Sequence, residues 1–160
     1  DTDRSRGLGD VYKRQLPYLY AAGAFLAPCC AAEPETPQPS PNTMNITIKA
    51  GEKEIAATLQ DNAAARDFVA RLPLTLTLED YGDTEKISPL PGKLSTAGSP
   101  AMGKPFRGAI AYYAPWGNLC IFRKAFEPSR GLVILGSVDG EGMKALDVSG
   151  KIRVTIDVKR

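Results

Sequence analysis

A proline-rich stretch, EPETPQPSPN over residues 33–42, constrains most strongly what this chain can fold into. Proline lacks the amide hydrogen that helices and sheet ladders need, and four prolines between Pro34 and Pro41 favour an extended polyproline conformation. The stretch offers almost no apolar surface to bury, and alternating strand patterns begin after Met44. We therefore expect a linker over residues 33–43 and one folded domain over residues 44–160.

The first fifteen residues, DTDRSRGLGDVYKRQ, are polar and show no sustained hydrophobic period. Their end, DVYKRQ, resembles the translation of a transposase-end adaptor used to prepare sequencing libraries. We interpret residues 1–15 as a sequencing-adaptor artefact and exclude them from fold reasoning; a natural disordered N-terminus is the alternative.

Residues 16–26, LPYLYAAGAFL, form an apolar run that is shorter than the about 20 residues a membrane-spanning helix needs. The run has the length of a signal-peptide core, so residues 16–32 are predicted to be a truncated signal peptide. Residues 26–29, LAPC, resemble a bacterial lipobox, although Pro28 stands where that motif has Gly, Ala or Ser. In that case Cys29 is lipidated and the lipid is the only membrane contact; cleavage after residues 30–32, CAA, would instead release a soluble protein.

Both routes place the domain outside the cytoplasm, and we expect a periplasmic or cell-surface lipoprotein. A cytoplasmic location stays open if residues 16–43 belong to a misjoined sequence.

The composition excludes several chemistries. The chain has no histidine, which removes Ser-His-Asp and Cys-His nucleophile systems and His-ligated zinc. A net charge of +2 without a dense Lys/Arg stripe gives no basis for nucleic-acid binding. The carboxylates between Glu79 and Glu85 lack the Gly and terminal Glu of a calcium loop, and no P-loop is present. We therefore predict no metal, no cofactor and no catalytic residue.

Within the domain, apolar alternation predicts strands over residues 45–49, 54–59, 74–78, 108–113, 119–122, 132–138 and 152–158. Asp61 or Asn62 is a good cap for a helix that runs to about Leu72, and a second helix is predicted over residues 141–146. Residues 86–107 are rich in Pro and Gly and are predicted to be a long loop. Many short strands with two helices indicate a closed β-barrel or a sandwich.

The order of these elements resembles the cyclophilin-like fold. The resemblance is carried by DNAAARDF at residues 61–68, LGSV at 135–138 with GMKAL at 142–146, and IRVTI at 152–156. A bacterial subfamily of cyclophilin-like domains of uncharacterised function is more similar still, through LPLTLTLEDY, EK, LPxxL, YYAPWGNLxIF and GLxxLG. The resemblance covers about residues 44–158 and implies a mainly β fold: a closed barrel of about eight strands with two short helices.

The resemblance also sets an expectation for activity. Active prolyl isomerases of this fold use an Arg on a Phe-His-Arg strand, with Phe, Met and Gln nearby, and no such motif occurs between Glu85 and Phe106. Lys86, Lys93 and Arg107 are the basic residues that remain to stabilise the twisted amide of an isomerising Xaa-Pro bond. The isomerase hypothesis would require one of these side chains to lie beside Phe122. Isomerase activity on Xaa-Pro bonds outside the cytoplasm is therefore the alternative rather than the main prediction.

The densest aromatic cluster, YYAPWGN at residues 112–118, supplies the candidate site. Pleat alternation sends Tyr112 and Tyr113 to opposite faces, so at most one of them lines a pocket. In the alternative, a purely structural role, aromatic side chains fill the barrel and Trp116 caps it. Cys120 is expected to be a buried structural thiol. The predicted ligand-binding residues are Tyr113, Trp116, Asn118, Phe122 and Arg107.

Together these patterns predict a monomeric, exported binding module for a small molecule or an extended peptide. A third hypothesis, an accessory domain that serves another polypeptide, predicts an exposed apolar patch in place of a pocket.

Overall fold

The structure, a computed structural model, describes residues 42–160. The adaptor-like segment 1–15, the predicted signal peptide 16–32 with Cys29, and the proline-rich linker up to residue 41 lie outside the described residues. Over residues 42–160 no helix combines the length and the apolar character needed to cross a membrane.

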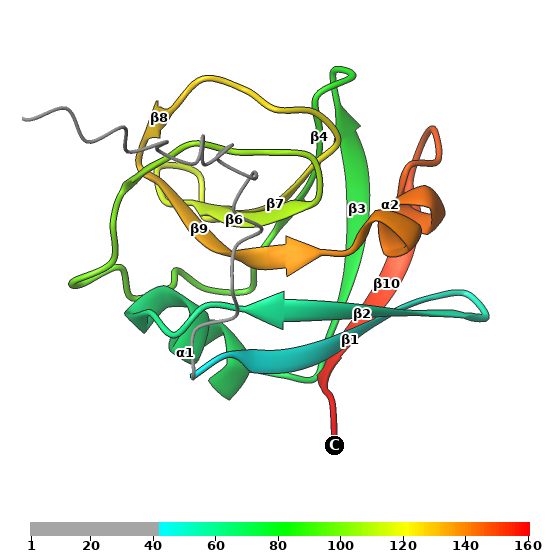
Figure 1. Cartoon of the computed structure of the whole chain (residues 1–160), viewed down its shortest axis with the longest axis horizontal. Helices are drawn as coiled ribbons and strands as arrows, with labels where there is room; N and C mark the ends of the chain where they lie inside the picture. The colour runs from blue at the N-terminus through cyan, green and yellow to red at the C-terminus, as the bar shows by residue number, and fades with distance from the viewer. Residues whose placement is uncertain (1–41) are drawn as a thin grey trace, which may run out of the picture. The chain divides into compact units, whose positions relative to one another are not determined.

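Eight strands close into an antiparallel barrel (Figure 1). They are β1 (Met44–Ala50), β2 (Lys53–Leu59), β3 (Leu74–Tyr81), β4 (Glu85–Pro89), β6 (Ala109–Tyr113), β7 (Asn118–Phe122), β9 (Leu132–Val138) and β10 (Ile152–Val158). Around the barrel the order is β2-β1-β10-β3-β4-β7-β6-β9, and pairing of β2 with β9 closes the ring. Two short strands extend the sheet beyond β9: β5 (Met102–Gly103) pairs with β9, and β8 (Ser129–Arg130) pairs with β5. The predicted mainly β, closed eight-stranded barrel is confirmed.

Alternation along the strands fills the barrel interior. Leu76 and Leu78 of β3 are buried, while Thr75 and Thr77 between them are exposed, as the pleat requires. Tyr112 also points inward, and its hydroxyl accepts a hydrogen bond from the backbone N–H of Leu94 at 3.1 Å. The interior is therefore a packed core and does not form a channel.

Two helices pack against this core. Helix α1 (Ala63–Ala70) is capped by Asn62, whose Oδ1 accepts from the backbone N–H of Ala65 at 2.9 Å, and it buries Phe68. Helix α2 (Gly140–Leu146) is capped in the same way by Asp139 and buries Met143 and Leu146. Both predicted helices are present, and α1 is shorter than expected because Arg71 already forms its C-cap.

The predicted loop over residues 86–107 is wrong in part, because it contains β4 and the short β5. In β4 the inward positions belong to Lys86 and Ser88, which are buried, and Pro89 ends the strand. Polar residues therefore occupy the buried positions, so the strand carries no apolar alternation that a sequence pattern could detect.

Strand β7 is buried on both of its faces. Leu119 and Ile121 belong to the barrel interior, whereas Cys120 and Phe122 belong to a second, smaller cluster on the outer face. Ala109, Ala111 and Leu132 complete the outer cluster. Three residues of this outer cluster, Cys120, Phe122 and Leu132, line the cavity described next.

Candidate functional site

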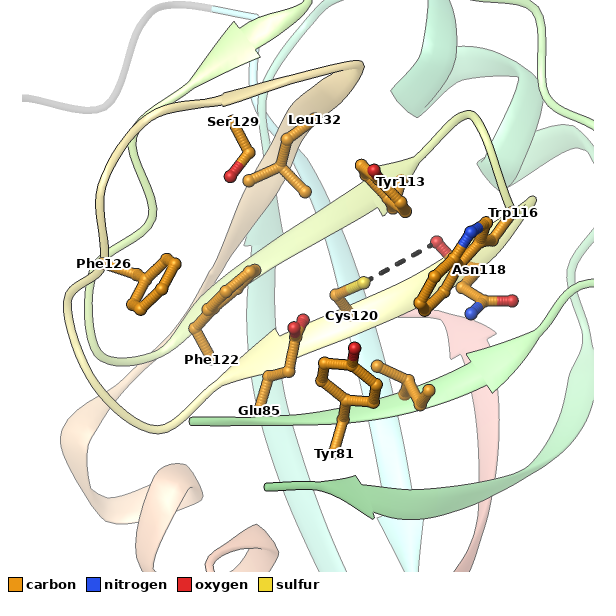
Figure 2. A pocket seen from close by; sticks show the side chains of 11 residues that line it. Tyr81, Glu85, Tyr113, Trp116, Asn118, Cys120, Phe122, Phe126, Ser129 and Leu132 are labelled. Carbon is orange, nitrogen blue, oxygen red and sulfur yellow. Dashed lines mark hydrogen bonds between the residues drawn. The ribbon is translucent and has the colours of Figure 1, made fainter. Parts of the chain in front are cut away.

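A cavity of about 240 Å³ lies on the outer face of the barrel, over β4, β6 and β7 (Figure 2). Its lining comes from the ends of β3 and β9, from the three strands of the floor, from the short strand β8, and from the connections around them. The lining residues are Tyr81, Glu85, Ile87, Tyr113, Trp116, Asn118, Cys120, Phe122, Phe126, Ser129 and Leu132. Four of the five predicted binding residues, Tyr113, Trp116, Asn118 and Phe122, are thus brought together.

The register of the floor strands explains this convergence. Tyr113 is paired with Asn118, Ile87 with Cys120, and Glu85 with Phe122. Residues two apart on a strand share a face, and directly paired residues on neighbouring strands share it too. The pairing therefore collects these side chains on the outer face and leaves Tyr112 inside, so only one of the two adjacent tyrosines lines the cavity.

An aromatic wall borders one side of the cavity. The ring of Trp116 lies between Tyr81 and Tyr113, with centroids 5.8 and 5.5 Å away and ring planes at 76° and 83°. These are edge-to-face contacts, the arrangement that the ring quadrupoles favour. Gly117, at a φ of 69°, turns the chain after Trp116 back into β7. The alternative in which Trp116 caps the barrel core does not describe this arrangement, because Trp116 stands over the outer face and is 58% exposed.

Among the described residues, Glu85 supplies the single carboxylate of the lining. Figure 2 shows its side chain rising from β4 into the cavity, between Phe122 and Tyr81. Burial raises the pKa of this carboxyl above its ordinary value of 4.5, and the adjacent Cys120 side chain offsets only part of that effect. Within residues 42–160 Glu85 has no ion-pair partner. The cavity therefore carries one poorly solvated acidic group among aromatic rings.

Cys120 lies on the floor and is 3% exposed. Burial raises the pKa of its thiol, and the nearby Glu85 carboxylate raises it further. The sulfur lies 3.9 Å from the carbonyl oxygen of Asn118, to which the thiol donates. A buried thiol that resists ionisation is a poor nucleophile, which agrees with the structural role expected for it.

The basic candidates lie elsewhere. Arg107 donates to the carbonyl oxygen of Arg123 at 2.9 Å and to a carboxylate oxygen of Asp147 at 3.2 Å, and it does not line the cavity. Lys86 is 1% exposed and points to the interior side of the wall, where its Nζ donates to Asp80. Lys93 is also absent from the lining. Among the described residues, then, no Lys or Arg side chain lines this cavity.

The sequence patterns missed the lining residues outside the segment 113–122, most of all Glu85, Tyr81 and Phe126. A usable signal existed for two of them. Tyr81 and Glu85 flank a tight turn at Gly82, and the hairpin pairs them directly, so they share a face. Phe126 sits in an irregular connection, where no periodicity indicates the direction of a side chain. Across residues 42–160 no group of three or more metal-ligating side chains is present.

Comparisons with known proteins agree with the architecture. No curated protein matches the chain. The solution structure of the hypothetical protein AF2241 from Archaeoglobus fulgidus is similar, with a TM-score of 0.51 and 18% identity over 72% of this chain and 95% of that one; at this identity the likeness shows the fold alone. The sequence profile described as the cyclophilin-like family matches residues 48–157. Because this match spans most of the barrel and more than half of the chain, the protein belongs to the cyclophilin-like family.

Proposed function

We propose that this protein is a binding module that holds a small molecule or an extended peptide segment in the aromatic cavity, and that it does not catalyse prolyl isomerisation. One observation carries the proposal: five aromatic side chains converge on one cavity although three of them, Tyr81, Trp116 and Phe126, are about half exposed. Exposed aromatic rings gathered around a concave site are typical of ligand recognition. A concave site also favours this role over that of an accessory domain with a flat apolar patch.

The charges around the cavity support binding over catalysis. Prolyl isomerisation needs an apolar slot and a hydrogen-bond donor, usually an Arg, beside the twisted amide. The described lining residues offer the slot without a basic donor, and their one carboxylate, Glu85, is an acceptor when charged. An acceptor at that position would not stabilise the amide during rotation.

Export and the monomeric state form part of the same proposal. Export rests on the apolar run and the lipobox-like LAPC of residues 16–32. Mass spectrometry of the protein from a bacterial host tests the anchor: a lipid mass on Cys29 that disappears in Cys29→Ser supports it, and an unmodified Cys29 contradicts it.

Protein NMR on the full chain tests the binding role. We expect a panel of Xaa-Pro peptides and small aromatic fragments to shift the Trp116 indole signal and its neighbours without accelerating the exchange between cis and trans peptide. Exchange faster than the uncatalysed timescale of tens of seconds would restore the isomerase alternative.

A pair of variants locates the site in this experiment. Trp116→Leu should remove the shifts, whereas Phe106→Leu, which changes an aromatic that is 45% exposed outside the lining, should preserve them. Shifts that survive Trp116→Leu, or that cluster away from the cavity, would contradict the proposed site.

A further inference from the structure

We propose that the group bound in the aromatic cavity is a small organic cation, an alkylammonium head group that pairs with Glu85 and contacts the rings around it. This inference rests on the proposed binding function and names the chemical class of its ligand. Three observations support it independently: the charge of the lining, the arrangement of the rings and the size of the cavity.

The charge of the cavity is uncompensated. Glu85 is poorly solvated, and no Lys or Arg of the described residues reaches it. Lys86, which follows Glu85 in sequence, and Arg123 and Lys124, which follow Phe122, are already paired elsewhere: Lys86 and Arg123 with Asp80, and Lys124 with Asp83. A cationic ligand is the partner that would relieve the cost of burying the Glu85 charge.

The ring geometry suits a cation. Trp116 meets both Tyr81 and Tyr113 with nearly perpendicular planes, so the three rings form two corners of a box. Phe122 and Phe126 extend the aromatic surface on the other side of Glu85 (Figure 2). The faces of aromatic rings attract an ammonium group, and Trp does so most strongly. A ring of aromatics around a carboxylate is therefore a site in which both kinds of lining residue favour the same ligand.

The size of the cavity selects a small group. Its volume of about 240 Å³ lies below the roughly 300–1,000 Å³ of pockets that hold drug-sized ligands. A compact head group with a few methyl or methylene carbons fits such a space. An extended polycation does not, because the single carboxylate of the described lining offers one charge to pair with.

Trp116 provides a direct readout, because it is the only tryptophan of the chain. We would titrate the full-length protein with choline and with n-butylammonium, at constant ionic strength, and follow Trp fluorescence. The matched neutral probe is 3,3-dimethylbutan-1-ol, in which carbon replaces the charged nitrogen of choline. We expect choline, n-butylammonium or both to bind at least about tenfold more tightly than the neutral alcohol, a difference of about 1.4 kcal/mol.

Glu85→Gln separates charge from shape. This variant should weaken binding of the cation by about tenfold or more and leave the affinity for the neutral alcohol within about twofold. Retained binding of the alcohol also shows that the cavity still forms. Glu79→Gln is the control, because Glu79 lies on the same hairpin but is exposed and paired with Lys151; it should leave both affinities unchanged.

The outcomes distinguish this inference from the proposed function. Equal affinity for cation and alcohol, or full cation affinity in Glu85→Gln, would overturn the inference and leave a binding site. No fluorescence response to either cation, together with NMR shifts of cavity residues caused by a neutral fragment, would also overturn the inference and leave the proposed binding function in place. If neither probes nor fragments reach Trp116, both the inference and the proposed function fail.

Discussion

Glu85 and Lys86 are consecutive in β4 but their charges lie on opposite sides of the barrel wall. The Nζ of Lys86 donates to Oδ1 of Asp80 and to the carbonyl oxygen of Gly150, each at 2.7 Å, whereas the carboxylate of Glu85 lines the outer cavity. The pleat of the strand separates the two side chains, so the cation next in sequence does not neutralise the acid. Both the electrostatics of the cavity and the stability of the barrel end follow from this arrangement.

The first prediction concerns the titration of Glu85. Its raised pKa means that the native protein binds the carboxyl proton of Glu85 more tightly than the unfolded chain does. Ionised Glu85 therefore destabilises the native protein at neutral pH. This destabilisation decreases as pH falls through the native pKa. NMR titration of the side-chain carboxyl should give a value above 4.5, because no Lys or Arg of residues 42–160 pairs with Glu85 to reverse this direction. Glu85→Gln should raise the melting temperature by roughly 1–3 °C. A native pKa of Glu85 at or below 4.5, or a melting temperature of Glu85→Gln below that of the wild type, would contradict the conclusion that the Glu85 charge has no partner among residues 42–160.

The second prediction concerns acid stability. Asp80 accepts hydrogen bonds from Lys86 and from the backbone N–H of Gly150, and Arg123 lies 2.7 Å away, which together lower its pKa from 3.8 to about 2. The unfolded chain therefore binds this proton more tightly than the native protein. The stabilisation is complete above about pH 5 and is lost progressively as pH falls through 4 towards 2. Asp67 and Asp83, whose pKa values are also lowered by basic partners, contribute in the same direction.

Urea unfolding between pH 2 and pH 7 checks this prediction. Asp80→Asn should be less stable than the wild type at pH 7, because it leaves the buried Lys86 without its anion, and its stability should change less between pH 4 and pH 2. Glu127→Gln, at an exposed position, is the control and should follow the wild-type profile. A wild-type profile that is flat between pH 4 and pH 2 would rule out the network as the source of acid sensitivity.

Sequence patterns predicted the fold because most strands of this barrel bury apolar residues at every second position. The Leu-Thr alternation of residues 74–78 and the apolar run of residues 119–122 both became strands of the barrel. Strand β4 escaped detection because Lys86 occupies a buried position, and its burial depends on Asp80 and Gly150, which are separated from it in sequence. Hydrophobic periodicity detects strands that bury apolar residues and does not detect a strand that buries an ion pair.

The candidate site likewise contains residues that local sequence patterns grouped and residues that only the strand pairing brings together. Tyr113, Trp116, Asn118 and Phe122 are local in sequence, so one hairpin pattern was enough to group them. Glu85 and Tyr81 join them only through the pairing of β4 with β7, and Phe126 only through an irregular connection. Arg107 was predicted to be a ligand-binding residue, yet its guanidinium lies against Asp147 and it does not line the cavity. Long-range strand pairing, which one sequence does not reveal, decides which charge reaches the cavity.

The third prediction concerns the closure of the barrel. Gly136 of β9 faces β2 so closely that an added Cβ would lie 2.1 Å from the carbonyl oxygen of Thr58 and 2.6 Å from the Cα of Leu59. Backbone atoms of a paired strand have little freedom to move away, so Gly136→Ala should cost at least about 3 kcal/mol, beyond the usual range for overpacking. Gly140 lies at the start of α2, where an added Cβ would have open space, with no packed neighbour within 4 Å. Gly140→Ala should therefore change the free energy of unfolding by no more than about 0.5 kcal/mol. Chemical unfolding of the two variants measures the contrast, and equal stabilities would show that β2 and β9 are not closely joined at this point.

The fourth prediction concerns the reactivity of Cys120. Its thiol is buried, and burial is the larger cause of its raised pKa, ahead of the charge of Glu85. Since the thiolate is the reactive form, iodoacetamide should modify Cys120 at least about tenfold more slowly in the native protein than in urea. Peptide mass spectrometry resolves this cysteine from Cys29 and Cys30. Glu85→Gln should accelerate the native reaction only severalfold, because it removes the smaller cause and leaves the thiol buried. Native labelling as fast as in urea would mean that the cavity floor opens readily, whereas acceleration to the unfolded rate in Glu85→Gln would assign control of the thiol to charge rather than to burial.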